Sequence, residues 1–489
     1  MGSDIDRTDF DDGEFAAFGQ RLEDNLRQLE ETLAQPGFGA GNGSLGSELE
    51  MYLVDADGLP LHANQELHAD ANDPQLTLEL NRYNLEYNLS PWPLDGQPFA
   101  NTEREILDKL SGLRQLAKAR GGQIVLTGIL PTLRRTDFGP HCITDRKRYH
   151  ALVKQLIRRR GHAFSVDING PEPLRLRMAD ITLEGANTSF QVHYRVRQED
   201  FADTFNAIQL VTPLVLAVSG NSPTLFGHCL WHETRVPLFK QSIDTRIRDR
   251  YGWNEPARVN YGHGWVRRGA LELFVEAVRL YEPLLPVCAD AREAEREPPP
   301  LSELRLHQST VWSWNRPVYD PADGGHLRIE MRALPAGPTP LDMVANAALL
   351  IGLAEGMRSR IHTLLPGLPF YLAEHNFYRA AQYGLAAPLV WPETGSSGYR
   401  EHRALTIVRE LLPLAYRGLA ELGIDNAEAE QYLGVIAQRL SRAQTGASWQ
   451  LMRLARLRCE LPPEEVNSAL LKEFIGHSVS NRPVAEWPL

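Results

Sequence analysis

The order of its predicted elements is what most constrains the fold of this chain. Apolar residues recur at helical spacing in three long segments and alternate with polar residues in three others. The helical segments are 12–34, 101–120 and 199–218, and the extended ones are 47–54, 188–196 and 326–333. After Pro340 the pattern is almost wholly helical. Strands and helices that follow one another without strict alternation favour an α+β fold with an antiparallel sheet over a doubly wound parallel sheet.

Three further segments add detail to this prediction. Residues 177–183 precede the strand at 188–196 with a glycine between them, so we expect the two to pair as a hairpin. Residues 303–310 are expected to form another extended segment. The stretch 220–264 is long, irregular and rich in Gly, Pro, Trp and Arg, a composition that favours a functional loop.

Charge and composition exclude several classes of partner. The chain carries 51 Lys and Arg against 62 Asp and Glu, a net charge of −11. It therefore offers neither the basic surface of a nucleic-acid-binding protein nor attraction to an anionic membrane. Its four cysteines are widely spaced, which argues against a disulfide framework and a zinc site. The acidic N-terminus has no apolar core, and the apolar stretch 208–218 is too short to cross a bilayer, so we expect a cytoplasmic protein.

Four glutamates in two extended segments are candidate metal ligands. Glu48 and Glu50 lie at i and i+2 of a predicted strand, so both carboxylates project from one face. A cation such as Mg²⁺ would relieve their repulsion. Glu79 and Glu86 would face opposite sides of one regular strand, so a bulge or turn near residues 81–84 is needed to bring them together. Taken alone, each pair is more typical of a solvated strand face.

A histidine and an arginine-flanked glutamate lie on the two later strands. His193 belongs to an alternating segment, where a lone histidine is more often structural than a ligand. Arg328, Glu330 and Arg332 share one face of the next strand. They could form an ion-pair ladder, or the glutamate could hold a metal while an arginine binds a phosphate.

Together these residues have the composition that phosphoryl transfer requires. A multivalent anion needs divalent metals to neutralise it and arginine for the transferred charge. The usual nucleotide-binding loops are missing, because the chain has neither a GxxxxGK[ST] motif nor a GxGxxG motif after a strand. Their absence disfavours a P-loop or Rossmann enzyme.

In their order along the chain, the motifs resemble those of glutamate–cysteine ligase family 2, a group that includes carboxylate–amine ligases. The resemblance covers about residues 40–350 and rests on an ordered set of short segments. These segments are Gly46-Ser47-Glu48-Leu49-Glu50, Leu85-Glu86-Tyr87-Asn88-Leu89-Ser90-Pro91, Val192-His193-Tyr194, Ser219-Gly220-Asn221-Ser222-Pro223, Thr234-Arg235 and Ile329-Glu330-Met331-Arg332.

The resemblance implies a fold and an activity. The fold would be a curved, antiparallel, glutamine-synthetase-like catalytic sheet with flanking helices. The cofactors would be ATP and Mg²⁺, with Mn²⁺ as an alternative ion, and the partners would be small-molecule amino acids. ATP would activate a carboxylate, by default that of glutamate, as an acyl phosphate that then joins to cysteine or another amine. We expect residues 1–375 to form the catalytic domain and residues 376–489 a helical region packed on it, and a homo-oligomer is compatible with the sequence.

The resemblance also implies roles for individual residues. The metal ligands would be Glu48, Glu50, Glu79, Glu86, His193 and Glu330. Arg332 would contact the phosphates of ATP, with Arg328 and His193 beside the nucleotide, and Arg235 would bind the carboxylate substrate. Of these residues, Arg332, Arg235 and Glu330 are expected to take part directly in catalysis.

Two segments depart from the family pattern, and two alternative functions remain. Residues 227–233 differ from the more usual Gly/Thr/Ser-rich version, and the Trp- and Arg-rich region 250–316 does not align, which leaves the substrate open. A guanidino kinase, which shares the broad sheet type, would transfer phosphate without forming an amide. A non-catalytic nucleotide-binding homologue is the third hypothesis, although all six expected metal ligands are present.

Overall fold

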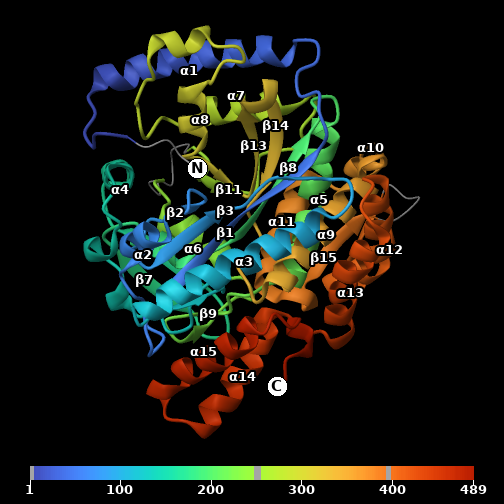
Figure 1. The fold of residues 1–489 in the computed structure, drawn as a ribbon. Helices are drawn as coiled ribbons and strands as arrows, with labels where there is room; N and C mark the ends of the chain where they lie inside the picture. Colours follow the sequence, from blue (N-terminus) through green and yellow to red (C-terminus); the bar gives the residue numbers. More distant parts are fainter. Residues whose placement is uncertain (1–4, 247–254, 393–397) are drawn as a thin grey trace.

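The chain folds around one curved antiparallel sheet (Figure 1). The computed structural model describes residues 5–246, 255–392 and 398–489. Six strands follow one another in the order β13, β14, β8, β1, β3 and β2, and the short strands β4 and β5 also pair with β1. Their bounds are β1 (Ser44–Val54), β2 (Leu76–Leu78), β3 (Asn84–Asn88), β4 (Trp92–Pro93), β5 (Gln123–Val125), β8 (Phe190–Val196), β13 (Asn315–Asp320) and β14 (His326–Met331). The predicted α+β class with a curved antiparallel sheet is confirmed.

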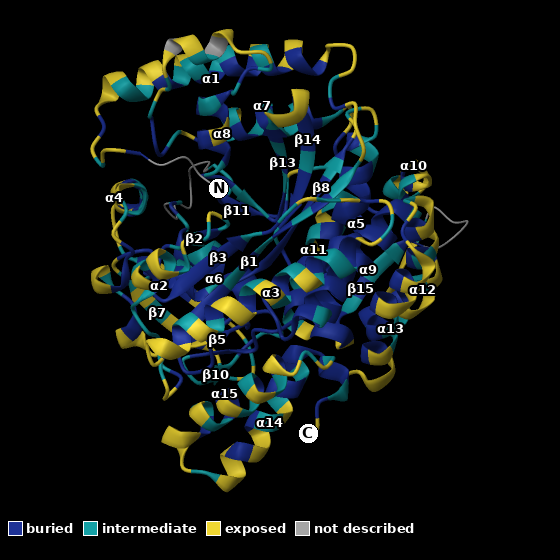
Figure 2. Ribbon diagram, viewed as in Figure 1, coloured by how far each residue is buried: buried dark blue, intermediate teal, exposed yellow. Residues whose placement is uncertain are grey.

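Two almost wholly buried helices pack against the sheet, α5 (Phe201–Ser219) and α9 (Pro340–Arg358) (Figure 2). Helix α9 begins at Thr339, whose side chain accepts a hydrogen bond from the backbone N–H of Asp342. Both helices are long and apolar enough to cross a membrane, but 89% and 94% of their apolar stretches are buried inside the protein. They therefore form a core with the apolar side chains on one face of the sheet.

Three helices lie together at one end of the sheet. They are α1 (Asp12–Leu33), α7 (Ala270–Leu280) and α8 (Ser302–Gln308) (Figure 1). The prediction of an extended segment at residues 303–310 is therefore wrong. The reason is a tertiary contact: the side chain of Asn25 on α1 accepts a hydrogen bond from the backbone N–H of Leu304 (3.1 Å) and so caps the first turn of α8.

Four two-stranded sheets border the main sheet in the described part of the chain. They pair β6 (Phe164–Ile168) with β7 (Leu174–Met178), β9 (Thr224–Leu225) with β10 (His228–Cys229), β11 (Val259–Asn260) with β12 (Trp312–Ser313), and β15 (Pro388–Pro392) with β16 (Tyr399–Arg403). Because β7 pairs with β6, the predicted hairpin between residues 177–183 and 188–196 is wrong. The chain instead turns at Asp180, whose carboxylate accepts from the backbone N–H of Thr182 (2.9 Å), and enters a short 3₁₀ helix, Thr182–Ala186.

The remaining helices surround this framework. They are α2 (Asn64–Ala71), α3 (Pro98–Ala119), α4 (Lys147–Arg160), α6 (Arg235–Ser242), α10 (Ile361–Leu364), α11 (Phe370–Tyr383), α12 (Ala404–Glu421), α13 (Asn426–Arg442), α14 (Gly446–Glu460) and α15 (Pro463–Val479). The boundary predicted at residue 375 falls inside α11. Trp449 and Phe474 of the last two helices share a buried cluster with Tyr52 of β1, so the C-terminal helices are part of the same core as the sheet.

A buried ion pair joins the C-terminal helices to α9. The guanidinium of Arg439 on α13 is 1% exposed and donates to Asp342 (2.7 Å), to the side chain of Asn346 (2.6 Å) and to the backbone carbonyl of Val218 (3.1 Å). One side chain thus connects α13, α9 and the end of α5. Its removal would leave the Asp342 carboxylate buried without its cationic partner.

We predict that Arg439→Leu destabilises the protein by about 3–5 kcal/mol, the usual cost of removing one partner of a buried pair. The free energy of unfolding in urea measures this loss. Arg442→Leu, at an exposed position of the same helix, is the matched control and should change it by less than about 0.5 kcal/mol. Equal stability of the two variants would contradict the prediction.

Candidate active site

The antiparallel register brings three predicted metal ligands together on one face of the sheet. Glu330 on β14 lies opposite His193 on β8. On the next strand, β1, Glu48 lies opposite Gln191, which is two residues from His193 and on the same face. The candidate ligand atoms of the three side chains all lie within 4.8 Å of one another. Nε2 of His193 is 3.3 Å from Oε1 of Glu48. Two carboxylates and an imidazole at this spacing form a donor set that suits a divalent cation.

The surroundings of His193 show how a cation would fit. Its Nε2 atom is buried and has no hydrogen-bond partner among the described residues, so it faces a possible ligand at this site. Its Nδ1 atom accepts from Nε of Arg328 (3.1 Å), and Arg328 is held in turn by Asp320 (2.6 Å). A histidine that binds a metal normally donates from its second nitrogen. Binding a cation through Nε2 would therefore require a proton at Nδ1 and a small turn of Arg328 away from it.

Two arginines hold the carboxylate of Glu330. Arg316 on β13 donates to it through Nε (2.6 Å) and Nη2 (3.0 Å), a bidentate pair, and Arg332 donates to it from the other side. Burial would raise the pKa of Glu330, but the charges of Arg316 and Arg332 outweigh it and hold that pKa well below its usual range. Arg332 also donates to the side chain of Gln191 (2.5 Å). The sequence allowed either an ion-pair ladder or a metal-binding glutamate on this strand. The geometry is compatible with both, because the ion pairs orient the carboxylate that would bind the metal.

Arg316 is a site residue that the sequence analysis did not identify. It lies in the Trp- and Arg-rich region 250–316, which showed no recognisable motif. A signal was nevertheless present, because Asn315–Asp320 alternates and is followed by a turn and then by the strand that carries Glu330. That order is typical of a hairpin, and in its register Arg316 lies directly opposite Glu330.

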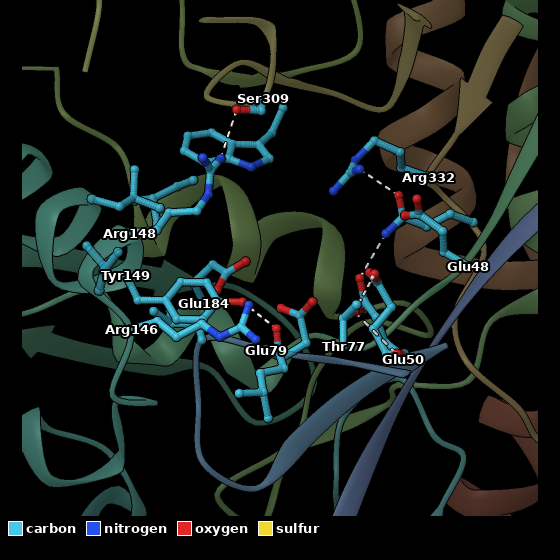
Figure 3. A pocket seen from close by; sticks show the side chains of 18 of the residues that line it. Glu48, Glu50, Thr77, Glu79, Arg146, Arg148, Tyr149, Glu184, Ser309 and Arg332 are labelled. Carbon is cyan, nitrogen blue, oxygen red and sulfur yellow. Dashed lines mark hydrogen bonds between the residues drawn. The ribbon is translucent and has the colours of Figure 1, made fainter. Parts of the chain in front are cut away.

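A second group of carboxylates lines the main cavity of the site, which Glu48, Arg316 and Arg332 also line. It consists of Glu50, Glu79, Glu86 and Glu184, and Figure 3 shows three of them from one side. The chain turns between β2 and β3, which brings Glu79 and Glu86 to the same cavity as the sequence analysis required. Glu50 is fixed by the backbone N–H of Ser189 (2.7 Å) and by Gln191 (2.9 Å).

The electrostatics of this second group are not balanced. Burial, together with the charges of Glu48 and Glu50, raises the pKa of Glu86 to about 8. Burial and the neighbouring carboxylates raise the pKa of Glu79 well above its usual range, and burial with Glu50 raises that of Glu184 to about 7. Acidic side chains crowded in this way bind protons or a cation in preference to remaining bare. A divalent cation fits this end of the face for that reason.

Glu184 is the second site residue that the sequence analysis missed. It belongs to the 3₁₀ helix Thr182–Ala186, and its carboxylate lines both the main cavity and a smaller one that adjoins it. The predicted hairpin placed this residue in the turn between two strands, where no side-chain direction follows from periodicity. The position of Glu184 depends on the turn at Asp180, and the spacing of residues in the sequence does not predict it.

Arg235 lies deeper, at the start of α6. It is 2% exposed and donates to Glu233 (2.7 Å) and to the backbone carbonyl of Ala333 (2.6 Å). Glu233 also accepts from the backbone N–H of Asn221 (2.9 Å) and from the hydroxyl of Ser222 (2.5 Å), so the Ser219–Pro223 motif forms a frame around it. Arg235 lines the smaller cavity, together with Glu50, Glu184 and Arg332. A guanidinium fixed in this way is well suited to a substrate carboxylate.

Comparison with known proteins agrees with this geometry. The model of glutamate–cysteine ligase family 2 matches residues 44–262, which contain β1, β3, β8 and the Arg235 frame. The predicted family resemblance is confirmed. Two curated relatives named "Putative glutamate--cysteine ligase 2-1" are each 26% identical. The one from Frankia alni matches over 88% of this chain and 95% of its own length, and the one from Frankia casuarinae over 78% and 80%.

A solved structure extends the likeness to the fold. Glutamate–cysteine ligase from Francisella tularensis, determined in complex with AMP, superposes with a TM-score of 0.53 at 11% identity. The match covers 92% of this chain and 95% of that one. At this level of identity the likeness shows a common fold. The roles assigned to the six predicted metal ligands and to Arg235, Arg328 and Arg332 stay predictions.

The crowded carboxylates predict how the stability of the chelator-treated protein depends on pH. Because the pKa of Glu86 is raised to about 8, the folded protein holds a proton that the unfolded chain has released above its ordinary value of 4.5. The free energy of unfolding should therefore fall as the pH rises from about 5 to 8, by at most about 1.4 kcal/mol per pH unit for this group.

Urea unfolding across this pH range tests the prediction. Glu86→Gln should flatten the profile because glutamine does not titrate, whereas Glu401→Gln on the exposed strand β16 should leave it unchanged. Adding MgCl₂ at pH 8 should raise the unfolding midpoint of the parent protein, because a cation that binds only the folded state stabilises it. A parent profile without this slope would refute the electrostatic account.

Proposed function

We propose that this protein is an ATP- and Mg²⁺-dependent carboxylate–amine ligase, with glutamate as the default carboxylate substrate. The observation that carries the proposal is the arrangement of Glu48, His193 and Glu330 within 4.8 Å, with Arg316 and Arg332 on the carboxylate of Glu330. The match to a ligase family over residues 44–262 supports the same activity, and the AMP in the Francisella structure supports a nucleotide substrate.

The proposed reaction has two steps. An oxygen of the substrate carboxylate attacks the γ-phosphorus of ATP, and the bond from that phosphorus to the ADP oxygen breaks, which gives an acyl phosphate and ADP. The amine nitrogen then attacks the acyl carbon, the bond to the phosphate oxygen breaks, and phosphate leaves with the electron pair. The nitrogen releases a proton to water or to a carboxylate of the cavity. The products are an amide, ADP and phosphate.

The protein would contribute mainly positioning and electrostatics. Divalent cations, when held by Glu48, His193 and Glu330 and by Glu50, Glu79 and Glu86, would supply the positive charge that lowers the repulsion between ATP and the carboxylate. Arg332 lies between the two groups of carboxylates, where it can meet the charge of the transferred phosphoryl group. Arg235 would orient the carboxylate substrate in the smaller cavity.

The direct test is to incubate the purified protein with ATP, MgCl₂ and a mixed amino-acid pool and to analyse the products by mass spectrometry. We expect ADP, phosphate and a compound whose mass equals that of two pool members minus water. A phosphorylated guanidino compound without an amide would show a guanidino kinase instead. Failure to consume ATP with any acceptor would favour a non-catalytic nucleotide-binding homologue.

We predict that Glu330→Gln and His193→Ala reduce ADP formation by about 10²-fold or more, the loss typical of removing one preorganised stabilising group. Circular dichroism and urea unfolding show whether each variant stays folded. Glu401→Gln, on the exposed strand β16, is the matched carboxylate control and should keep full activity. Full activity of both site variants would refute the assignment of this face.

A further inference from the structure

One wall of the main cavity has no part in the phosphoryl chemistry proposed above. The cavity has a volume of about 180 Å³ and lies between the carboxylates of the sheet and helix α4. Its apolar wall on the side of α4 includes Tyr149, Leu152, Leu156, Ile181, Ile243 and Trp312. Leu156, Ile181 and Ile243 are each at most 1% exposed, so they belong to the core and give the wall a fixed shape.

Two aromatic residues of the wall, Tyr149 and Trp312, line the cavity. The hydroxyl of Tyr149 donates to the backbone carbonyl of Leu78, which occupies the polar end of that side chain. The ring of Trp312 packs edge-on against Phe239, with 6.2 Å between the ring centroids. A ligand on this side of the cavity would contact Tyr149, Leu152 and Trp312, which are half-buried. An apolar cavity of about 150 Å³ already binds benzene, so the space suffices for a branched or aromatic side chain.

Side chains of both charges line the cavity. Arg146, which precedes α4, and Arg148 on α4 both line it, and Ser309 accepts from Nη2 of Arg148 (2.9 Å), which orients that guanidinium. Figure 3 shows Arg148 near Ser309, on the side opposite Glu48 and Glu50, and Arg146 beside Glu79 and Glu184. A free α-amino acid is a zwitterion, and its carboxylate would be attracted to Arg148. Of the second group of carboxylates, Glu184 is the one that the proposed reaction assigns to no cation, so it can attract the ammonium group.

We propose that the amine acceptor is an α-amino acid with an apolar side chain larger than that of cysteine, bound in this cavity with its carboxylate at Arg148 and its side chain on the apolar wall. This proposal rests on the proposed ligase function and specifies its second substrate. A pocket of this kind discriminates by about tenfold or more for each methylene that it buries. The acceptor is thereby selected by shape and apolar contact rather than by a thiol.

The experiment measures ADP release with glutamate, MgCl₂ and single acceptors: leucine, phenylalanine, cysteine, alanine and aspartate. We expect leucine or phenylalanine to exceed cysteine and alanine in kcat/KM by at least about tenfold. In Leu152→Asn, which places an amide on the wall, the advantage of the larger apolar acceptors should fall by about tenfold. Ile157→Asn, at an exposed position of the same helix, is the matched control and should keep the parent preference.

A second pair of variants tests the role of Arg148. Arg148→Gln should raise the KM for the amino acid by about tenfold or more but leave that for leucinamide, which lacks the carboxylate, nearly unchanged. Arg158→Gln, exposed on the same helix, should change neither constant. Because this pair is independent of the wall, it keeps the proposal testable if Leu152→Asn does not fold.

The outcomes separate this proposal from the ligase function itself. Failure to release ADP with glutamate and each of the acceptors would refute the proposed function. Efficient ligation with a preference for cysteine or aspartate would refute only the apolar acceptor. The wall could instead bind the adenine base of ATP. In that case Leu152→Asn would raise the KM for ATP and leave the acceptor preference unchanged, and this result would also overturn the proposal.

Discussion

The antiparallel register of β14, β8 and β1 is the constraint on which the site depends. Side chains alternate between the two faces of a strand, so a slip of one residue would move the polar side chains of that strand from the site into the core. The register is fixed from the other face, where Leu49, Val192 and Ile329 are each at most 1% exposed and belong to the core cluster that also contains residues of α5 and α9. The apolar packing behind the sheet thus places Glu48, His193 and Glu330 together in front of it.

The face of the sheet that carries the site has two parts, which differ in the balance of their charges. Around Glu330 the charges are nearly balanced, because Arg316 and Arg332 hold that carboxylate and keep its pKa low. Around Glu79, Glu86 and Glu184 they are not balanced, and the pKa of each is raised. Balanced charges give a rigid, oriented ligand, whereas crowded ones create a demand for cations or an ammonium group. A reaction that joins a phosphoryl donor to an amine would use both parts.

Much of this site follows from local sequence, and the exceptions have identifiable causes. The pair Glu48 and Glu50 and the ladder around Glu330 were predicted because strand periodicity fixes which side chains share a face. Glu79 and Glu86 needed a turn, which the sequence indicated without giving its shape. Arg316 was missed because its hairpin follows an irregular, aromatic-rich region without a recognisable motif. Glu184 was missed because it lies in a 3₁₀ helix. A turn has no period from which a side-chain direction can be inferred.

The sequence by itself determined the α+β class, the strand faces and the set of carboxylates, histidine and arginines, because these depend on periodicity, spacing and residue chemistry within short segments. Only the tertiary structure decided that α8 is a helix, since its first turn is capped by Asn25 from α1, and that the C-terminal helices share a core with β1. It also decided which residues meet the carboxylates across the cavity, because α4 and residues near 181, 243 and 309–312 come together there to form the apolar wall and to hold Arg148. Such a cavity depends on contacts between residues far apart in the chain, and no local pattern records which of them will meet.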